Sequence, residues 1–352
     1  TAVINSSLAG VYKTARDRGA KKVYGMLHGI QGLLQERYVD LSEHIKNDLD
    51  IELLKRTPSA YLGSCRFKLP EISEDRAIYD RIFEILDGLE VEYFFYIGGN
   101  DSMDTIKKLS DYAIVKGHKQ KFLGVPKTID NDLWGTDMTF GFQSAVDIAT
   151  STIDCIHTTA TSHSRVFIVE VMGHKVGWVT LHAGIAGGAD IILLPEIPYD
   201  LNVISEAIEK RTKAGKHFTI IAVAEGAMSK EEAAMPKKAY KAKLKERKYP
   251  SIAYELAEEI QKKTDQEVRI TVPGHTQRGG SPCPYDRVLA TRLGSAAAEL
   301  ILKEEYGYMV GMKKGETVKV PLSEVAGKLK MVDPDSKIIK EAKLTGISFG
   351  DK

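Results

Sequence analysis

The chain has few cysteines, no long apolar run and almost no net charge. Its three cysteines, Cys65, Cys155 and Cys283, are odd in number and far apart, so they indicate neither a disulfide framework nor a metal-binding pattern and suit a reducing cytoplasm. No apolar run approaches the ~20 residues of a membrane-spanning helix. Basic and acidic residues nearly balance, 49 − 48 = +1, which argues against a nucleic-acid surface. We therefore expect neither a membrane nor a nucleic-acid partner.

Two widespread phosphate-binding fingerprints are also missing. Neither the P-loop pattern G-x-x-x-x-G-K-[ST] nor the dinucleotide pattern G-x-G-x-x-G occurs in the sequence. The length of 352 residues allows two domains with a sizeable core each. With 43% hydrophobic and 28% charged residues, the composition is that of an ordinary globular protein.

Apolar runs bounded by glycine or proline recur along the chain and predict strands. The runs are VYGML, EYFFYIGG, KFLGVP, RVFIVEVMG, ADIILLPE, FTIIAVAEGA and EVRITVPGH. Such runs are typical of strands buried on both faces of a parallel sheet. Helical patterns lie between them, for example at 77–89 and 201–215, and this alternation predicts a doubly wound α/β fold. Ligands bind at the carboxyl ends of strands in such folds. Because GGNDS, PKTIDND, MGH, AEGA and PGHTQRGG each follow a strand, we expect them to form one composite site.

Two segments depart from this pattern. The chain opens with helix-like residues and only then gives a strand at 22–26, whereas an α/β domain normally begins with a strand. We therefore expect a first strand before Thr1 in the natural protein. The segment KKAYKAKLKERK (237–248) is strongly basic, but it is short and has acidic neighbours. A solvated helix face or surface insertion is favoured over a nucleic-acid arm.

The turn GGNDS joins a predicted strand to a predicted helix. Gly98 and Gly99 allow backbone conformations and close ligand approach that side chains forbid. Ser102 is placed to cap the following helix, and a helix N-terminus binds phosphate through its amides and dipole. Glycine pairs before helices are common, so the turn alone is weak evidence. Asp101 puts a negative charge directly in the turn.

The loop PKTIDND follows the next strand. Asp130 and Asp132 can divide labour, one accepting a proton from an attacking hydroxyl and the other holding a metal or orienting the first. Lys127 and Thr128 supply a positive charge and a hydroxyl for phosphate. A capped surface turn uses the same residue types, and only the neighbouring GGNDS turn favours function.

Cations and one carboxylate mark the remaining strand ends. Arg269, His275 and Arg278 surround a Gly-Gly-Ser-Pro turn and resemble a clamp for an anionic substrate, because guanidinium matches phosphate bidentately. Arg165 begins another buried strand, where a surface ion pair is an equally good interpretation. Glu225 follows the strand FTIIAVA, where it either bonds sugar hydroxyls or caps the next helix.

Taken together and in this order, GG-x-DS, P-K-TIDND, EVMG, AEG and GH-x-QRGGSP-x-PYDR resemble the phosphofructokinase family, from about Ala2 to about Leu300. The resemblance implies magnesium-dependent phosphoryl transfer to the 1-hydroxyl of fructose 6-phosphate in glycolysis. It also implies two doubly wound domains with mostly parallel sheets and the active site in the inter-domain cleft. The donor domain would comprise residues 1–140 plus about 277–327, and the sugar domain residues 141–276 plus about 328–352. Members assemble as homodimers or homotetramers that share sites between subunits.

The resemblance also implies residue roles. Asp130 matches the catalytic base, and Thr128, Asp132 and Lys127 surround the transferred phosphoryl group. The residues expected near the donor phosphates are Gly98, Gly99, Asp101, Ser102 and Arg66. Those expected at the sugar are Met172, Gly173, His174 and Glu225, with His275 and Arg278 at its 6-phosphate and Arg165 and Arg269 reaching that phosphate from a neighbouring subunit. The expected magnesium ligands are Asn100, Asp101 and Asp132.

Two positions depart from the family pattern. His174 stands where M-G-R is usual, which replaces a fixed charge with one that titrates near neutral pH. Asn100 stands where the family has the aspartate of G-G-D, so the amide brings no charge to the magnesium site. Both departures put the corresponding contacts in question.

The donor is the remaining choice. Members that use ATP resemble one another in carrying glycine at the positions of Asp101 and Lys127, whereas members that use pyrophosphate carry aspartate and lysine. A carboxylate fills and repels the space of a nucleotide α-phosphate, so pyrophosphate is the expected donor and ATP the alternative. A non-catalytic sugar-phosphate-binding subunit is a third hypothesis, supported only by Asn100 and His174.

Overall fold

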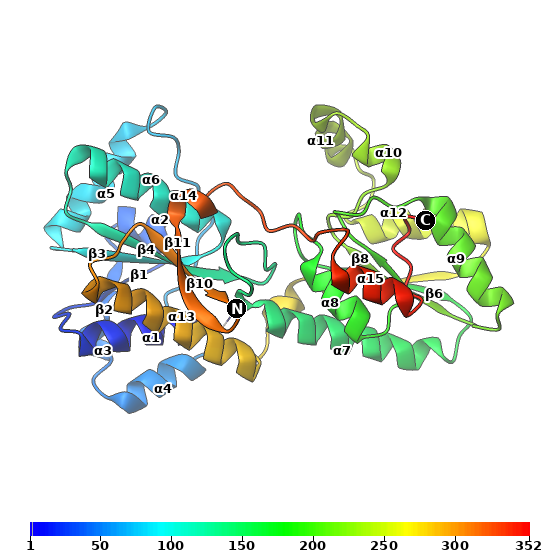
Figure 1. Ribbon diagram of the computed structural model, residues 1–352, viewed down its shortest axis with the longest axis horizontal. Helices are drawn as coiled ribbons and strands as arrows, with labels where there is room; N and C mark the ends of the chain where they lie inside the picture. The colour runs from blue at the N-terminus through cyan, green and yellow to red at the C-terminus, as the bar shows by residue number, and fades with distance from the viewer. Residues whose placement is uncertain (2) are drawn as a thin grey trace. The chain divides into compact units, whose positions relative to one another are not determined.

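The structure, a computed structural model, describes Thr1 and residues 3–352. The chain forms two compact units. The first unit comprises Thr1–Gln143 and Gly279–Lys330, and the second comprises Ser144–Arg278 and Met331–Lys352. Each unit contains a sheet with parallel strands (Figure 1), which confirms the expected α/β class. Which ligand each unit binds stays a prediction.

The sheet of the first unit has the strand order β11-β10-β4-β3, with the short β5 beside the end of β4. Its strands are β3 (Tyr93–Gly98), β4 (Lys121–Thr128), β5 (Phe140–Gly141), β10 (Tyr308–Lys313) and β11 (Glu316–Pro321). β3, β5 and β10 are each parallel to β4, and β11 returns antiparallel to β10. The carboxyl ends of β3 and β4 therefore lie side by side.

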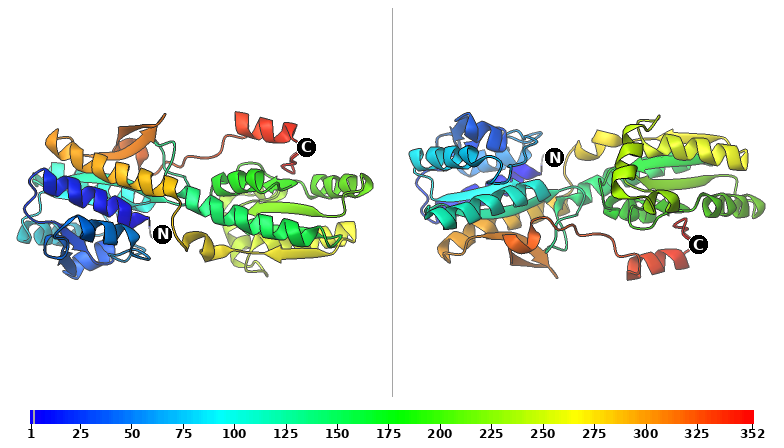
Figure 2. Two further views of the ribbon diagram at one scale, coloured as in Figure 1. Left: turned by 90° about the horizontal axis from the view of Figure 1, so that it is seen from below. Right: turned by 90° about the horizontal axis from the view of Figure 1, so that it is seen from above.

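Helices cover both faces of this sheet (Figures 1 and 2). The helices of the first unit are α1 (Ile4–Asp17), α2 (Gly29–Leu34), α3 (Leu41–His44), α4 (Asp48–Arg56), α5 (Arg76–Gly88), α6 (Asn100–Lys116), α13 (Pro284–Leu302) and α14 (Leu322–Val325). Of these, α3 packs against β1 and α4 against α1. Phe122 of β4 packs among residues of α5 and α6, with its ring centroid 5.9 Å from that of Phe83. Leu123 and Val125 pack instead with residues of α1 and α13. The opposite packing follows from the alternation of side chains along a strand.

The strand expected at 22–26 does not join this sheet. β1 (Tyr24–Met26) pairs only with β2 (Tyr38–Asp40), as a separate antiparallel ribbon. The expectation of a buried parallel strand is wrong here because the run is short and its side chains alternate in burial. Its partner β2 has one exposed and two half-buried residues.

The second unit has a fully parallel sheet in the order β7-β8-β6-β9. Its strands are β6 (Val166–Val171), β7 (Ile191–Leu193), β8 (Thr219–Ala224) and β9 (Val268–Thr271). Every residue of β6, β7 and β8 is buried, as continuous apolar runs predict. The expected strands from RVFIVEVMG, ADIILLPE, FTIIAVAEGA and EVRITVPGH are thus confirmed.

The helices of the second unit complete its layers. They are α7 (Phe142–Ala160), α8 (Trp178–Ala186), α9 (Leu201–Lys213), α10 (Lys230–Ala233), α11 (Lys237–Lys245), α12 (Ile252–Thr264), the 3-10 helix η1 (Gly274–Arg278) and α15 (Lys337–Leu344). α9 and α12 pack on β6, β7 and β8 through one apolar cluster that includes Ile204 and Ile260. α8 packs against β7 and β8, and the helix α7 begins within the last two residues of the first unit's segment.

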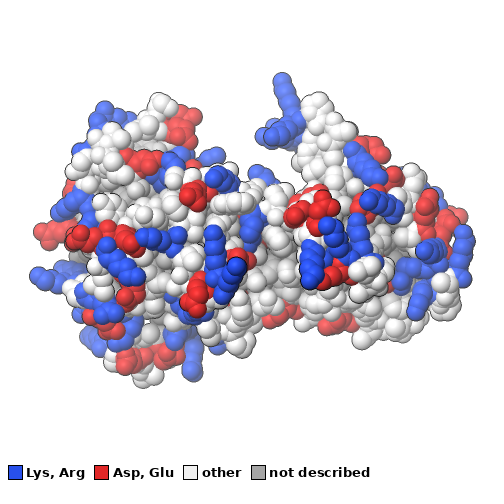
Figure 3. Space-filling model, in the orientation of Figure 1, with Lys and Arg blue, Asp and Glu red and all other residues white. Residues whose placement is uncertain are grey.

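The basic segment forms a solvated helix. α11 buries none of its residues, and Lys243 pairs with the buried Glu232 at 2.9 Å. Lysine and arginine are interspersed with aspartate and glutamate over the face in Figure 3, in keeping with the near-zero net charge. The expectation of a solvated helix face is confirmed. In the part of the chain that the structure describes, no helix is long and apolar enough to cross a membrane.

The hairpin β10–β11 was not among the strands expected from the sequence. Its loop consists of Lys314 and Gly315, with φ of 50° and 84°. Two residues with positive φ between antiparallel strands form a type I′ turn, the turn whose twist matches that of the strands. The alternation in ETVKVP and the Lys-Gly pair were the available signals.

We predict that Gly315→Ala lowers the free energy of unfolding by about 1 kcal/mol, because alanine is strained at positive φ. A Cβ at Gly315 would meet nothing within 4 Å, so the effect is purely conformational. The matched control is Gly88→Ala in α5, where a Cβ also meets nothing but the helix favours alanine by up to about 1 kcal/mol. Chemical denaturation followed by circular dichroism should give opposite signs, and equal signs would contradict the turn assignment.

Candidate active site

The GGNDS turn connects β3 to α6 in the first unit. A Cβ at Gly98 would lie 2.1 Å from Ser102 Oγ, so only glycine fits beneath the turn. α6 begins at Asn100 with Gly99 as its N-cap, and the Ser102 amide donates to the Gly99 carbonyl at 3.0 Å. The expectation that Ser102 caps the helix is therefore wrong. The N-cap is Gly99, three residues before Ser102, and Asp101 is exposed in the first turn of the helix.

A half-buried tyrosine contacts this turn. Burial raises the pKa of Tyr96 to about 12, and its hydroxyl is hydrogen-bonded to Ser102. The hydroxyl therefore stays protonated throughout the neutral range, so the Tyr96–Ser102 bond does not change with pH there. Tyr96 was not predicted as part of the site, since its place in an apolar run indicates only a core residue.

The TIDND loop (residues 128–139) follows β4 and lies next to the turn. Gly98 pairs with Pro126 across β3 and β4, which brings Lys127 and Thr128 to the same edge as the turn. The Asp130 amide donates to Thr128 Oγ1 at 3.0 Å. Asp130 is half-buried. The structure thus brings together Lys127, Thr128 and Asp130 as expected from their spacing.

One side-chain hydrogen bond joins the turn to the loop. Asn100 Nδ2 donates to Asp132 Oδ2 at 2.7 Å, and Asp132 is 6% exposed. An aspartate at position 100 would repel Asp132 at this distance unless a cation lay between them. The side-chain amide of Asn100 instead donates a hydrogen bond, and this bond holds the two motifs together without a cation.

These residues suit a magnesium ion whose other ligands are water and substrate phosphates. Within residues 1 and 3–352 no group of three His, Cys, Asp or Glu side chains is arranged to hold a metal ion. Magnesium in phosphate-transfer sites usually takes one or two carboxylates and completes its shell with water and substrate phosphates. Asp132, Asp101 and the Asn100 amide oxygen fit that mode.

Lys330 was not predicted, although it anchors the TIDND loop. Its Nζ donates at 2.9 Å to Asn131 Oδ1 and to the backbone oxygens of Thr136 and Asp137. Burial lowers the pKa of Lys330 to about 8, against the opposite effect of Asp137 and Asp132. No motif surrounds Lys330 in the sequence, so only the fold could reveal this contact.

Arg66 lies in the segment between α4 and α5. It is exposed, and the neighbouring Cys65 Sγ lies 3.2 Å from where a Cβ of Gly29 would stand. The same Cβ would lie 3.6 Å from Tyr96 Oη. The segment that carries Arg66 is thus packed near the tyrosine that contacts the GGNDS turn.

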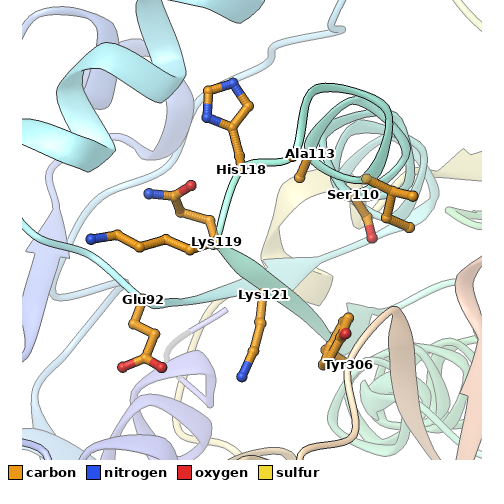
Figure 4. Close-up of a pocket in the computed structure, with 10 residues that line it drawn as sticks. Glu92, Ser110, Ala113, His118, Lys119, Lys121 and Tyr306 are labelled. Atoms are coloured by element: carbon orange, nitrogen blue, oxygen red, sulfur yellow. The ribbon is translucent and has the colours of Figure 1, made fainter.

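A pocket of about 390 Å³ opens at the other edge of this sheet (Figure 4). Glu92 precedes β3, Lys121 begins β4, and Ser110 and Ala113 belong to the second half of α6. The pocket therefore lies at the amino ends of the strands. A six-residue strand is about 20 Å long, so this pocket is separate from GGNDS and TIDND.

In the second unit, three loops meet at the carboxyl ends of β6, β8 and β9. Glu225 Oε1 accepts the amides of Gly173 at 3.1 Å and His174 at 2.5 Å. Gln277 Oε1 accepts the Met172 amide at 3.0 Å. A Cβ at Gly226 would lie 2.3 Å from the His174 carbonyl oxygen, so glycine is required where the loops touch.

These contacts assign new roles within the quoted motifs. Glu225 orients the loop that carries His174. The sequence had predicted for Glu225 either a bond to sugar hydroxyls or a helix cap, and not this contact. Gln277 is 2% exposed and was not singled out, although it lies between two expected substrate residues. His275 and Arg278 flank it in η1 and are both exposed. The pattern thus exposes His275 and Arg278 and buries Gln277 between them.

Arg165 and Arg269 lie at the opposite edge of the same sheet. Both form ion pairs with Glu267, and Val166 pairs with Val268 where β6 and β9 begin. The hydrogen bond from Arg165 holds the pKa of Glu267 below its ordinary value. Because β6 has six residues, about 20 Å of strand separates these arginines from Met172. The structure does not bring them to the other sugar residues of this unit.

Comparisons with known proteins agree with this arrangement. The family model described as Phosphofructokinase matches residues 1–301. The chain is 44% identical over 355 residues to the ATP-dependent 6-phosphofructokinase of Spirochaeta thermophila, covering 99% of this chain and 94% of that relative. It is 39% identical over 350 residues to ATP-dependent 6-phosphofructokinase 3 of Bacteroides thetaiotaomicron, covering 99% and 96%.

Two similar solved structures belong to the same family, but their names state a different phosphoryl donor. The pyrophosphate-dependent phosphofructokinase of Marinobacter aquaeolei is similar with a TM-score of 0.81 at 30% identity, covering 99% of this chain and 89% of that one. The pyrophosphate-dependent enzyme of Nitrosospira multiformis has a TM-score of 0.83 at 27% identity, with the same coverage. On its sequence and its fold, the chain belongs to the phosphofructokinase family.

Proposed function

We propose that this chain transfers a phosphoryl group from pyrophosphate to the 1-hydroxyl of fructose 6-phosphate, in a reversible, magnesium-dependent step of glycolysis in the cytoplasm. The products are fructose 1,6-bisphosphate and phosphate. The observation that carries the choice of donor is the pair Asp101 and Lys127. Both belong to the edge where β3 and β4 end, since Gly98 and Pro126 are paired there.

Electrostatics supports this donor. A carboxylate about 4 Å from a phosphate charge costs about 4 kcal/mol at an effective dielectric of about 20. In this proposal Asp101 disfavours a nucleotide because its carboxylate fills and repels the space that an α-phosphate would need, and pyrophosphate has no such third phosphate. Lys127 offers a compact positive charge to a small, highly charged donor. A glycine at either position would lose the corresponding effect.

The transfer itself needs a base and charge neutralisation. The Asp130 carboxylate accepts the proton of the sugar 1-hydroxyl as the oxygen–phosphorus bond forms, and the bridging bond of pyrophosphate breaks to release phosphate. Lys127 and Thr128 bind the oxygens of the transferred group, which is the positioning that phosphoryl transfer requires. Magnesium, when bound near Asp132, Asp101 and Asn100, supplies further neutralisation of phosphate charge.

The second unit supplies the sugar contacts. The exposed donors His275 and Arg278 suit the 6-phosphate. The loop of Met172, Gly173 and His174, fixed by Glu225 and Gln277, presents backbone groups to the sugar. Because this loop is held from both sides, its backbone is oriented before the sugar arrives.

We further propose that a homodimer or homotetramer shares each site. Arg165 and Arg269 lie about a strand length from the other sugar residues of their own unit. A second copy of the chain can present this edge to the 6-phosphate, and Glu267 holds both guanidinium groups on one face. The sharing of sites between copies follows from a symmetric assembly.

ATP is the second candidate donor. The curated relatives from Spirochaeta thermophila and Bacteroides thetaiotaomicron are named as ATP-dependent, whereas the two structural relatives are named as pyrophosphate-dependent. Sequence identity favours the first group, and Asp101 with Lys127 favours the second. We place more weight on the two residues, because they belong to the edge of the sheet at which we propose that the donor binds.

We predict that Asp130→Ala lowers kcat by about 10²–10⁴-fold while the KM for fructose 6-phosphate changes little, because the base acts in the transition state. Steady-state kinetics with pyrophosphate measures both. Asp154→Ala, an exposed carboxylate on α7, is the control and should leave kcat unaltered. Turnover that survives in Asp130→Ala would show that another group is the base.

We predict that Asp101→Gly with Lys127→Gly lowers kcat/KM for pyrophosphate by about 100-fold, since a charge-assisted contact contributes about 1.5–3 kcal/mol. The same variant should gain turnover with ATP. The matched control replaces Asp111 and Lys116, which are exposed in the second half of α6, and should leave donor preference unchanged. If the unaltered protein turns over ATP and not pyrophosphate, the donor proposal fails while phosphofructokinase activity stands.

We predict that Arg165→Ala and His275→Ala complement each other. Each variant alone should lose sugar-phosphate affinity in every site. In a refolded equal mixture, hybrid dimers regain one intact site, and activity should return to roughly a quarter of the unaltered level. A mixture that stays as inactive as its components would mean that both residues serve the same subunit.

A further inference from the structure

The ammonium group of Lys330 is enclosed by oxygens of the TIDND loop. Its three hydrogen bonds, each 2.9 Å, go to the Asn131 side chain and to two backbone carbonyls, those of Thr136 and Asp137. The backbone amide of Lys330 also donates to the Asp132 carbonyl at 2.8 Å. An ammonium has three donors, so these acceptors can satisfy all of them. The bonds reach both the beginning and the end of the loop.

Asn131 connects this lysine to the two aspartates. It lies between Asp130 and Asp132 in the chain, is 3% exposed, and has a left-handed backbone with φ of 55°. Its Oδ1 accepts from Lys330 Nζ and from the Thr139 amide at 3.0 Å. A left-handed conformation persists in a non-glycine residue when its surroundings hold it. The side-chain contacts of Asn131 supply that restraint.

The loop is also held from a different side. The Asp137 amide donates to the Met312 carbonyl at 2.7 Å, and Thr136 Oγ1 accepts the Met312 amide at 2.9 Å. These contacts fasten the end of the loop to the hairpin β10–β11. They do not involve Asn131, whose Oδ1 is bonded instead by Lys330 and Thr139. At the beginning of the loop these contacts act beside the bond from Asn100 to Asp132.

We infer that Lys330 is a positioning residue for phosphoryl transfer: by holding Asn131, it fixes the carboxylates of Asp130 and Asp132 on either side of it. The inference rests on the proposed role of Asp130 as the base. Lys330 itself touches neither the sugar nor the donor in this role. It acts through the backbone of the loop, whose geometry must be kept within about 0.5 Å for a preorganised site.

The test is the variant Lys330→Met, which keeps the length of the side chain and removes its donors. We expect kcat to fall by about 100-fold, the effect of a misplacement of about 1 Å, while KM for both substrates stays within about twofold. Lys328→Met is the matched control, because Lys328 is exposed two residues away, and it should retain full kcat. Thermal unfolding of both variants separates lost positioning from lost folding.

A double-mutant cycle tests whether the effect passes through Asn131. Asn131→Gly removes the amide while glycine keeps the left-handed backbone. If Lys330 acts through Asn131, the double variant loses little more kcat than the more impaired single variant. If Lys330→Met does not fold, Lys330→Gln keeps two N–H donors and should show the same loss of kcat to a smaller extent.

Three results would overturn the inference. They are full kcat in a folded Lys330 variant, a raised KM with unchanged kcat, or losses that simply multiply in the double variant. Failure of the proposed function is recognised separately in the same assay. In that case the unaltered protein is inactive with both donors, or Asp130→Ala keeps its turnover.

Discussion

A hydrogen bond from Asn100 to Asp132 joins the two motifs of the first unit that are expected to bind phosphate. It connects the start of α6 to the TIDND loop at 2.7 Å, and both partners follow adjacent parallel strands. In a site with two aspartates here, a cation would be needed to keep the carboxylates together. The amide removes that need, so the positions of the two motifs are set before any ligand binds. With asparagine in place of aspartate at position 100, the site also offers one negative charge fewer to a bound magnesium ion.

A loop of the second unit is likewise held by side chains beside it. There the backbone amides of three consecutive residues, Met172 to His174, donate to the side chains of Gln277 in η1 and of Glu225, which follows β8. Such bonds to a carboxylate are stronger than bonds between neutral groups. Both halves of the proposed reaction thus rest on loops that are held by side chains beside them, while the groups that face the ligands, such as His275 and Arg278, stay exposed.

The sequence predicted what depends on local pattern. The buried parallel strands and the expected edge for GGNDS and TIDND followed from apolar runs and from the glycines that end them. The sequence predicted the cap of α6 at Ser102, because serine is a preferred N-cap residue. That preference does not show that Gly98 and Gly99 let the helix begin earlier. Lys330 could not be predicted, since it lies about 200 residues along the chain from Asn131 and becomes its neighbour only through the fold. Gln277 was visible in a motif, but only the structure shows which backbone it anchors.

The exposed position of Asp101 also bears on how donor preference changes in evolution. An acidic residue in a first helical turn contributes about 0.3–1 kcal/mol, and glycine within a helix costs up to about 1 kcal/mol. Against a typical stability of about 5–15 kcal/mol, the fold can bear either residue. An aspartate codon becomes a glycine codon by one base change. If the donor is chosen as proposed, the exchange at Asp101 is a step between donors that carries little risk to folding, and the exchange at Lys127 is a second step. The network around Asn131 and Lys330 leaves the neighbouring loop less tolerant of substitution.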